Sequence, residues 1–332
     1  MMIQSKALYL LAQKLRCAFI LTLMAFAGTV SAQAWPTKPI TLLNPFPAGG
    51  GTDAFARPLA AQLGEQLGVQ VLIDNRGGAG GTVGASVAAK AAPDGYNWFI
   101  GASHHTIAPS MYKNLDYDIE KSFIPVALIA SPPQVLVVNP QKVSARDLKQ
   151  FIELLKKNPG KYNFASAGSG TVHHLAGELF KIQTGTFITH IPYRGAGPAM
   201  NDLLAGQVDL EFDGLGTSAQ QINGGKLFAI AVASPKRSAA IPNVPTFMEA
   251  GLPNYEVSTW YAMFAPKGTP KPIVDKMIAE IEKAINTPKL KAIWAANGSE
   301  TPNLYGEAFG KLVNSDIKRW AGVVKKSGAT LD

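Results

Sequence analysis

The sequence predicts an α/β protein made of two similar halves, each organised around a largely parallel sheet. Apolar strand-like runs alternate with helix-like segments, which is the pattern of parallel strands joined by helices. Both halves contain the same local device, a strand followed by a Gly/Ser loop and a helix start, near 40–55 and again near 162–172. Two β-rich connectors, near 125–138 and 256–264, lie where the chain can pass between the halves.

Residues 1–34 are expected to be an export signal that is removed. A basic start is followed by an apolar run at 18–30 and by a small-x-small cleavage pattern that ends at Ala34. The apolar run is too short for a stable membrane span, and Cys17 lacks the preceding small apolar residues of a lipoprotein anchor. We therefore expect a soluble periplasmic protein that begins near Trp35.

Composition narrows the class of protein further. Loss of the signal removes the only cysteine, so a packed core must stabilise the fold without disulfides, and the hydrophobic fraction of 47% can supply that core. It also removes three basic residues from a formal net charge of +8. The remaining positive charges are scattered, with no basic tract or interleaved aromatic residues, so nucleic-acid binding is not expected.

The first half opens with a strand at 40–43 and a bend at 44–53 that holds three consecutive glycines. A helix-like pattern then runs to Leu67 and is stopped by Gly68. Pro58 either marks the true first turn of this helix or kinks it, and the pattern leaves both open. The elements expected next are a strand at 69–73, a glycine loop at 76–82, an alanine-rich helix at 83–92, a strand at 98–101, and a loop at 102–106.

The second half repeats this order after two strands at 125–130 and 134–138, which are separated only by Ser-Pro-Pro. The expected elements are a helix at 145–157, a strand at 162–165, a Ser/Gly loop at 166–171, a helix at 172–184, a short strand ending at 190–195, a helix at 198–204, a strand at 208–213, a helix at 217–223 and a strand at 228–232. After the run at 257–264, helices are expected at 272–285, 288–296 and 304–326.

The glycine loops are the candidate binding elements. A bare loop between a strand and a helix leaves backbone N–H groups free, and the helix dipole adds positive potential, so such a loop suits an anion. The loops at 44–53, 76–82 and 166–171 all have this form. Each is also consistent with an ordinary tight turn, so no single loop decides the function.

Short motifs occur in order along essentially the whole mature chain. They are Phe46-Pro-Ala-Gly-Gly-Gly-Thr-Asp53, Asn75-Arg-Gly-Gly-Ala-Gly-Gly81, Ala92-Pro-Asp-Gly-Tyr96, Pro125-Val-Ala-Leu-Ile-Ala130, Leu136-Val-Val-Asn-Pro140, Phe164-Ala-Ser-Ala-Gly-Ser-Gly-Thr171, His174-Leu-Ala-Gly-Glu-Leu-Phe180, Ile191-Pro-Tyr-Arg-Gly195, Leu204-Ala-Gly-Gln-Val-Asp209, Phe212-Asp213, Val244-Pro-Thr246 and Gly268-Thr-Pro270. This series resembles the Bug family of extracytoplasmic solute receptors, the TctC-like binding proteins of tripartite tricarboxylate transporters.

The resemblance implies a Venus-flytrap receptor of the periplasmic-binding-protein type II class, with two α/β domains joined by two crossing strands. One domain would comprise 35–132 and 256–332, and the other 133–255. Members of the family typically bind small carboxylates, largely through main-chain groups and ordered water. The resemblance therefore implies a carboxylate ligand, a membrane permease as partner, a monomeric receptor without a cofactor or metal, and no catalysis.

The resemblance also implies a set of ligand-binding residues. On one wall these are Phe46, Ala48, Gly50 and Thr52, with Ser103 and His105 from the third strand's loop; on the facing wall they are Ser166, Gly168, Ser169, Gly170, Thr171, Tyr193, Arg194, Gly195 and Asp213. An Arg at 194, where many relatives carry Lys, could form a forked pair with a carboxylate. Asp213 is open to two interpretations, a turn acid or a cleft acid that pairs with Arg194 or a ligand ammonium. This chain has the pair His104-His105 where relatives commonly carry a single His, so the identity of the ligand is harder to infer from relatives.

Other functions compete with this interpretation. Gly49-x-Gly51-x-x-Ala54 followed by Asp74 imitates a dinucleotide fingerprint, but the spacing is long and an exported protein meets little NAD(H). An exported hydrolase would need Ser166 or Ser169 beside a histidine, and a sensory co-receptor would differ only in its membrane partner.

Metal binding is a further alternative. The five histidines could join Asp213 or Glu178 in a site, but adjacent histidines on an extended strand point to opposite faces and no His-x₃-His pair occurs. His173 and His174 would lie in the first turn of a helix, where the dipole disfavours the charged imidazole.

Overall fold

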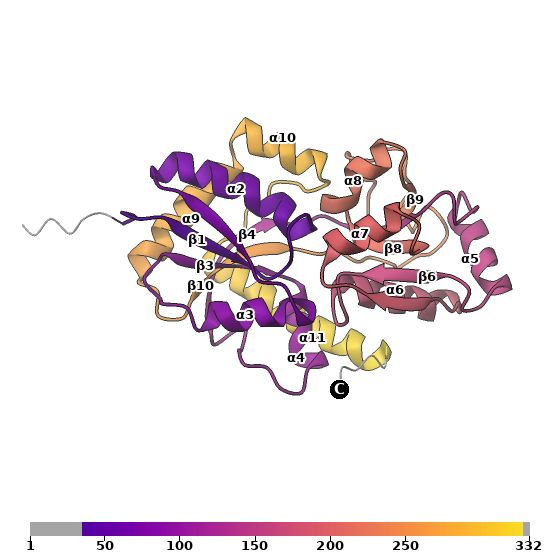
Figure 1. The fold of residues 1–332 in the computed structure, drawn as a ribbon, viewed down its shortest axis with the longest axis horizontal. Helices are drawn as coiled ribbons and strands as arrows, with labels where there is room; N and C mark the ends of the chain where they lie inside the picture. The colour runs from indigo at the N-terminus through magenta and orange to yellow at the C-terminus, as the bar shows by residue number, and fades with distance from the viewer. Residues whose placement is uncertain (1–34, 328–332) are drawn as a thin grey trace, which may run out of the picture. The chain divides into compact units, whose positions relative to one another are not determined.

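The computed structural model describes residues 35–327, so the predicted export signal lies outside the described residues. The chain divides into Met1–Thr37 and a compact unit, Lys38–Asp332, and all that follows concerns this second unit. It contains two five-stranded sheets, which we call sheet 1 and sheet 2 (Figure 1).

Sheet 1 has the strand order β2-β1-β3-β10-β4. Strands β1, β2 and β3 are parallel, whereas β10 runs antiparallel to both β3 and β4. The elements of this half are β1 (Ile40–Asn44), α2 (Gly51–Leu67), β2 (Val71–Asn75), the 3₁₀ turn η1 (Ala79–Gly81), α3 (Thr82–Ala89), β3 (Asn97–Ala102), α4 (His104–Met111), β4 (Phe123–Ala130), β10 (Tyr261–Pro266), α9 (Lys271–Ile285), α10 (Pro288–Ala296) and α11 (Gly306–Ser327).

Sheet 2 repeats the same plan in the order β7-β6-β8-β5-β9. Strands β6, β7 and β8 are parallel, and β5 is antiparallel to β8 and β9. Its elements are β5 (Gln134–Val138), α5 (Leu148–Lys157), β6 (Asn163–Ser166), α6 (Val172–Thr184), β7 (Thr189–Pro192), α7 (Ala196–Leu204), β8 (Leu210–Gly214), α8 (Leu215–Asn223) and β9 (Phe228–Val232).

Two segments carry the chain between the sheets, as the β-rich connectors predict. The first runs from β4 to β5 and the second from β9 back to β10. They are bonded to each other, because Pro133 and Ser258 form an antiparallel bridge and the Gln134 N–H donates to the Val257 carbonyl oxygen over 3.0 Å. The two crossings therefore form one paired connection, and the C-terminal helices return to sheet 1 as expected.

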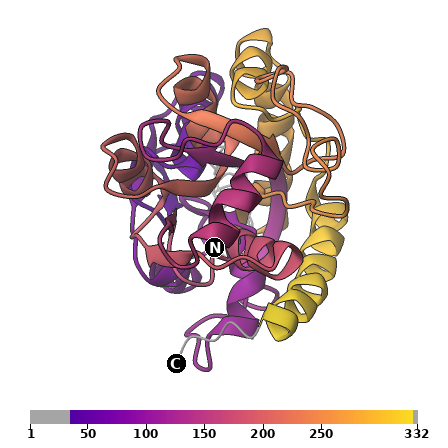
Figure 2. The same ribbon diagram turned by 90° about the vertical axis from the view of Figure 1, so that its right-hand side faces the viewer.

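The C-terminal helices cover sheet 1 and also reach sheet 2. Helices α9 and α10 pack against α2, whereas α11 packs against α4, β4 and α6. Figure 2 shows the C-terminal helices, in orange to yellow, along one side of the ribbon. Trp320 and Val324 of α11 share an apolar cluster with Ile107 of α4 and with Phe164 and Phe180 of the second half. This cluster ties the halves together by apolar burial.

The structure corrects the sequence interpretation in two places and decides one question that the sequence left open, the position of Pro58. Residues 104–106 were expected in a loop, but α4 begins at His104, so the argument from an extended strand for His104 and His105 was wrong. Helix α2 begins within the triple glycine and continues through Pro58, which places this proline inside the helix. The run at 257–264 becomes regular strand only at Tyr261, because the preceding residues belong to the crossing.

Candidate functional site

Two helix N-termini from opposite halves meet at glycines. Helix α2 begins after Gly50 and α7 after Gly195, and neither N-cap residue makes a side-chain capping bond. A Cβ atom placed on Gly50 would lie 3.6 Å from the Gly197 nitrogen, and one on Gly197 would lie 2.8 Å from the Ala48 carbonyl oxygen. The positive ends of two helix dipoles therefore lie close together, an arrangement that an anion between them stabilises.

The bend before α2 is held from within by Asp53. Its buried carboxylate accepts hydrogen bonds from the Gly49 N–H (3.1 Å), from Arg57 Nε (2.6 Å) and from Asn44 Nδ2 (3.4 Å). Thr52 beside it is buried, whereas Ala48 at the tip of the bend is exposed. The bend is therefore held in one shape by the hydrogen bonds of Asp53.

Phe46 connects this bend to the histidines of α4. Its buried ring lies edge-on to the His104 ring, with 5.1 Å between centroids, and its carbonyl oxygen accepts a 2.8 Å hydrogen bond from Asn75 Nδ2. A Cβ atom on Gly81 would come within 2.8 Å of the Phe46 ring, so the second glycine loop closes directly over it. Phe46 therefore occupies the place where both glycine loops of the first half meet.

Ser103 and His105 are both fully buried and both occupied by internal hydrogen bonds. Ser103 Oγ lies 2.9 Å from Thr259 Oγ1 in the second crossing segment. His105 Nδ1 accepts from the Ala102 N–H over 3.0 Å, and Nε2 lies 3.3 Å from the Gly81 carbonyl oxygen. Nδ1 also lies 3.0 Å from the Ala102 carbonyl oxygen, to which it would donate in the other tautomer, so both ring tautomers find hydrogen-bond partners here. Burial lowers the pKa of His105 from 6.5 to about 4, so the ring is neutral at pH 7.

The Ser166–Thr171 loop of sheet 2 faces the second glycine loop of sheet 1. A Cβ atom on Gly80 would lie 3.0 Å from the Ser169 carbonyl oxygen. Several of its groups are already bonded: the Gly168 N–H donates to Ser166 Oγ (3.1 Å), the Gly170 N–H to His174 Nδ1 (3.2 Å), and the Thr171 hydroxyl to the Gly168 carbonyl oxygen (2.7 Å). The loop therefore has fewer free N–H groups than its sequence predicts. It does lie between the two halves, as expected.

Tyr193, Arg194 and Gly195 lead into α7. Tyr193 is partly buried and donates its hydroxyl hydrogen to Asp202 Oδ2 over 2.7 Å, while burial and Asp202 raise its pKa to about 12. The Arg194 side chain is exposed and, within residues 35–327, makes no hydrogen bond or ion pair. Gly195 has a φ of 141°, and a Cβ atom there would lie 2.8 Å from the Pro47 ring. This turn therefore requires a glycine to approach the first half.

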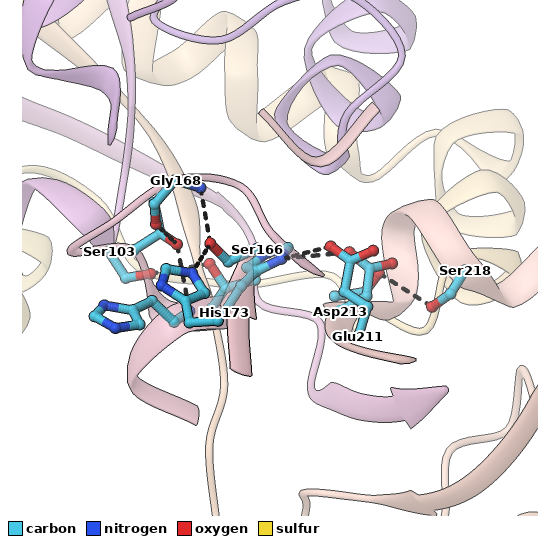
Figure 3. A network of polar contacts seen from close by, with 12 residues as sticks. Ser103, Ser166, Gly168, His173, Glu211, Asp213 and Ser218 are labelled. Carbon is cyan, nitrogen blue, oxygen red and sulfur yellow. Dashed lines mark hydrogen bonds and ion pairs between the residues drawn. The ribbon is translucent and has the colours of Figure 1, made fainter. Parts of the chain in front are cut away.

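Asp213 lies in a buried acidic cluster on β8. Figure 3 shows its carboxylate beside that of Glu211, with contacts to His173 at the start of α6. His173 Nδ1 is 3.2 Å from Glu211 Oε1 and 3.7 Å from Asp213 Oδ1. All three side chains are at most 3% exposed. Asp213 is neither a turn acid nor a partner of Arg194 in this arrangement, because it lies within the strand and faces His173.

Burial determines the protonation of this cluster. It raises the pKa of Glu211 and of Asp213 well above their usual values, with the Glu211 charge adding to the effect on Asp213. Burial also lowers the pKa of His173, which the Asp213 charge partly opposes. Each shift has the same cause, since a charge removed from water is disfavoured unless it gains a partner.

The sequence interpretation did not include Glu211, and it considered His173 only in the metal alternative. One signal was present: Asp209, Glu211 and Asp213 alternate within an otherwise apolar strand. In β8, between β6 and β5, such residues must be buried. Their proximity to the start of α6 depends on tertiary packing and could not be read from the pattern.

Ser166 also contacts a histidine. Its Oγ lies 2.6 Å from His190 Nε2, the only Ser–His contact of this kind among the described residues. The His190 ring stacks on that of His174 at 4.1 Å, and burial and His174 lower its pKa to about 3. No carboxylate within residues 35–327 contacts the His190 ring. This pair therefore lacks the third group that orients the base of a nucleophilic triad.

Two α/β halves joined by a paired crossing, with glycine loops between them, define a solute-binding protein. The family profile described as "Tripartite tricarboxylate transporter family receptor" (TctC) matches residues 55–329. The BugT protein of Bordetella pertussis is 38% identical over 307 residues, which cover 92% of this chain and 94% of BugT.

Solved structures agree with this assignment. The periplasmic binding protein BugD superposes with a TM-score of 0.86 at 38% identity, covering 90% of this chain and all of BugD. Rpa4515 of R. palustris with adipate gives 0.86 at 34% identity, with 90% of this chain and 100% of that chain covered. MatC of Rhodopseudomonas palustris with bound malate gives 0.83 at 34% identity, with 87% and 100% covered.

The chain belongs to the TctC family of tripartite tricarboxylate transporter receptors, the Bug proteins. The predicted fold class, a type II periplasmic binding protein, is confirmed by these likenesses and by the two mixed sheets. Within residues 35–327, none of the helices is both long and apolar enough to span a bilayer.

Proposed function

We propose that this protein captures a small organic carboxylate between its two halves and delivers it to a tripartite tricarboxylate-type permease. The observation that carries the proposal is the meeting of the α2 and α7 N-termini, where uncapped glycines bring two positive helix ends together. Relatives of the same fold hold adipate and malate, which supports a carboxylate as the ligand.

The proposed binding residues are those carried over from the family resemblance, apart from Asp213, which faces His173 in the β8 cluster. Gly50, Thr52 and Gly195 would offer helix-start amides, and the exposed Arg194 would pair with a ligand carboxylate in a forked geometry. His105 would act indirectly, because its ring nitrogens hold Ala102 and Gly81. Closure then depends on a ligand that touches both halves. A ligand that binds the open and closed forms equally well does not change the equilibrium between them.

The proposal includes a domain division, a location and a partner. We place the domain boundaries at 35–132 with 256–332, and 133–255, because the strands sort between the two sheets at these positions. We also place the mature protein in the periplasm as a monomer that acts without catalysis. A cell lacking this protein should lose uptake of the radiolabelled ligand and regain it only with the mature receptor supplied in the periplasm.

The test is a thermal-shift screen of the mature protein against mono-, di- and tricarboxylates. We expect stabilisation by at least one carboxylate and its loss in Arg194→Ala. Gly197→Ala should also abolish it, because the added Cβ would lie 2.8 Å from the Ala48 carbonyl oxygen and hold the α2 and α7 starts apart. Lys161→Ala serves as an exposed basic control. Equal stabilisation in all four proteins would place the ligand site elsewhere.

The Ser166–His190 contact supports one competing function, an exported hydrolase. The bond of 2.6 Å has the reach that a nucleophile and base require. However, Ser166 is fully buried, and its oxygen also accepts from the Gly168 N–H. We therefore expect no turnover of p-nitrophenyl esters above the rate of Ser166→Ala, and turnover that this substitution removes would favour the hydrolase.

A further inference from the structure

The buried cluster on β8 brings ligand atoms of metal-binding type to one point. His173 supplies an imidazole nitrogen, and Glu211 and Asp213 each supply a carboxylate oxygen; these three atoms all lie within 4.8 Å of one another. Zinc bonds to such atoms are about 2.0–2.2 Å long, so ligand atoms around one ion lie roughly 3.3–3.6 Å apart. The separations of His173 Nδ1 from the two carboxylate oxygens, 3.2 Å and 3.7 Å, lie close to that spacing, and the shorter one is also a hydrogen bond to Glu211 Oε1.

The cluster is short of hydrogen-bond donors. Glu211 Oε2 and both Asp213 carboxylate oxygens are buried and have no hydrogen-bond partner among the described residues. Ser218 of α8 donates to the Gly214 carbonyl oxygen over 3.4 Å. Its hydroxyl and the Gly214 N–H lie close enough to Asp213 to oppose the rise of that pKa, but neither reaches an Asp213 oxygen in hydrogen-bond geometry. A native interior satisfies nearly all of its buried polar atoms, so three orphaned carboxylate oxygens at one place indicate a missing partner that takes lone pairs.

The cluster also lacks a compensating cation. No lysine or arginine of the described residues forms an ion pair with Glu211 or Asp213, and His173 is their only basic contact. Two ionised carboxylates in a buried site carry a desolvation cost, and a divalent cation between them would offset part of it. Gln134, which pairs with Gly214 at the end of β8, has both side-chain amide atoms buried without a partner.

We propose that His173, Glu211 and Asp213 bind one divalent transition-metal ion, with Zn²⁺ as the best match to an imidazole and two carboxylates. This donor set excludes a hard-cation cage of the Ca²⁺ type, which takes six to eight oxygens. The sequence argued against a metal because no His-x₃-His pair occurs on a helix. The structure provides the other two ligands from an adjacent strand, at i and i+2.

The ion would lie on sheet 2 and be covered by sheet 1. The His104 ring of α4 stands 5.9 Å from the His173 ring, and its Nδ1 is buried without a partner. Tyr261 of β10 is also buried, and the nearby Asp213 adds to the effect of burial in raising the pKa of its hydroxyl. Metal entry therefore requires the halves to separate, and a bound ion would strengthen their closed arrangement.

The test uses the mature protein freed of metal on a chelating resin, in a buffer without soluble carboxylates that could themselves bind. Zn²⁺ titration calorimetry should show one site per chain, and Co²⁺ should give visible d–d absorption bands typical of nitrogen and oxygen ligation. Glu211→Gln and Asp213→Asn keep the shape of each side chain, and each should weaken Zn²⁺ binding by roughly 100-fold or more.

Glu178→Gln is the matched control. Glu178 lies 3.8 Å from His174 on the same helix, a His–Glu contact without a third ligand, so this variant should bind Zn²⁺ like the parent protein. The proposal is overturned if the parent protein shows no Co²⁺ bands, or if Asp213→Asn binds Zn²⁺ as tightly as the parent. It is also overturned if the metal-free protein binds amino-substituted carboxylates that Asp213→Asn rejects while no metal binds, because the acids would then recognise an ammonium. Carboxylate binding by the metal-free protein is measured separately, so failure here leaves the proposed function standing.

Discussion

The two halves share a strand order but differ in how their buried carboxylates are bonded. In sheet 1, Asp53 accepts three hydrogen bonds and His105 is bonded through both ring nitrogens. In sheet 2, Glu211 and Asp213 keep three carboxylate oxygens without a partner. Polar groups that are fully bonded stabilise a fold, whereas unpaired ones cost free energy and are retained where a ligand uses them.

We infer from this contrast that the buried carboxylate of the first half stabilises the fold, whereas those of the second half remain available to a ligand. Both halves present glycines at helix starts, so the difference lies in side chains and not in backbone plan. Substitutions of matched chemistry in the two halves should therefore change stability with opposite signs.

The largest expected effect is the loss of folding stability at low pH that the buried His105 causes. Its pKa is about 4 when folded and 6.5 when unfolded, so the unfolded state takes up the proton first as the pH falls. The stability that the neutral ring contributes is complete above pH 6.5 and is lost progressively down to about pH 4, a total of about 3 kcal/mol. Denaturant unfolding at pH 7.5 and pH 4.5 measures this loss.

His105→Gln is the informative variant, because the amide can still donate to the Gly81 carbonyl oxygen without titrating. Its loss of stability between the two pH values should be smaller than that of the parent protein. The buried histidines of the second half titrate in both proteins and cancel in the difference, whereas the pKa of the neighbouring His104 rises slightly when the His105 charge is removed. An identical pH slope in the two proteins would show that His105 is already neutralised by another route.

Asp53→Asn should lower stability by about 2 kcal/mol, because the carboxylate holds Gly49, Arg57 and Asn44 by charge-assisted bonds in a buried position. Arg57→Ala should cost less than about 1 kcal/mol, because Arg57 is 51% exposed and its pair is screened by water. Chemical denaturation compares the two. Equal losses would mean that the Arg57 pair, and not the backbone bonds, holds the bend.

Asp213→Asn makes the same chemical change in the other half and should raise the stability of the metal-free protein by about 1 kcal/mol. It removes a buried acid that has no hydrogen-bond donor, and it supplies two N–H groups beside Glu211. Thermal unfolding after resin treatment measures the change. A loss of stability comparable to that of Asp53→Asn would show that Asp213 has a partner in the folded protein.

The same contrast explains what could be predicted from the sequence. Alternating apolar runs and glycine loops are local signals. They predicted the order of strands and helices along the chain, the two connectors and the place where the halves meet. The start of α4 was missed because Ser103 makes no capping bond and Pro109 lies within the helix, so both local helix signals were absent or misleading. The cluster at Glu211 was missed because its partner His173 comes from a helix 38 residues earlier.

A small expected effect tests whether Ser166 behaves as a fully bonded group of the second half. Ser166 Oγ bonds to His190 and accepts from the Gly168 N–H, so it resembles Asp53 in role more than it resembles Asp213. Ser166→Ala should therefore lower stability by about 1 kcal/mol and leave Zn²⁺ affinity unchanged, as measured by denaturation and calorimetry on the same preparations. If Ser166→Ala is more stable than the parent protein, Ser166 of β6 is destabilising like the two acids of β8. The difference between bonded and unbonded polar groups would then coincide with the two halves. A modest loss would instead locate the unsatisfied chemistry at the β8 cluster alone, as three orphaned carboxylate oxygens at that one position indicate.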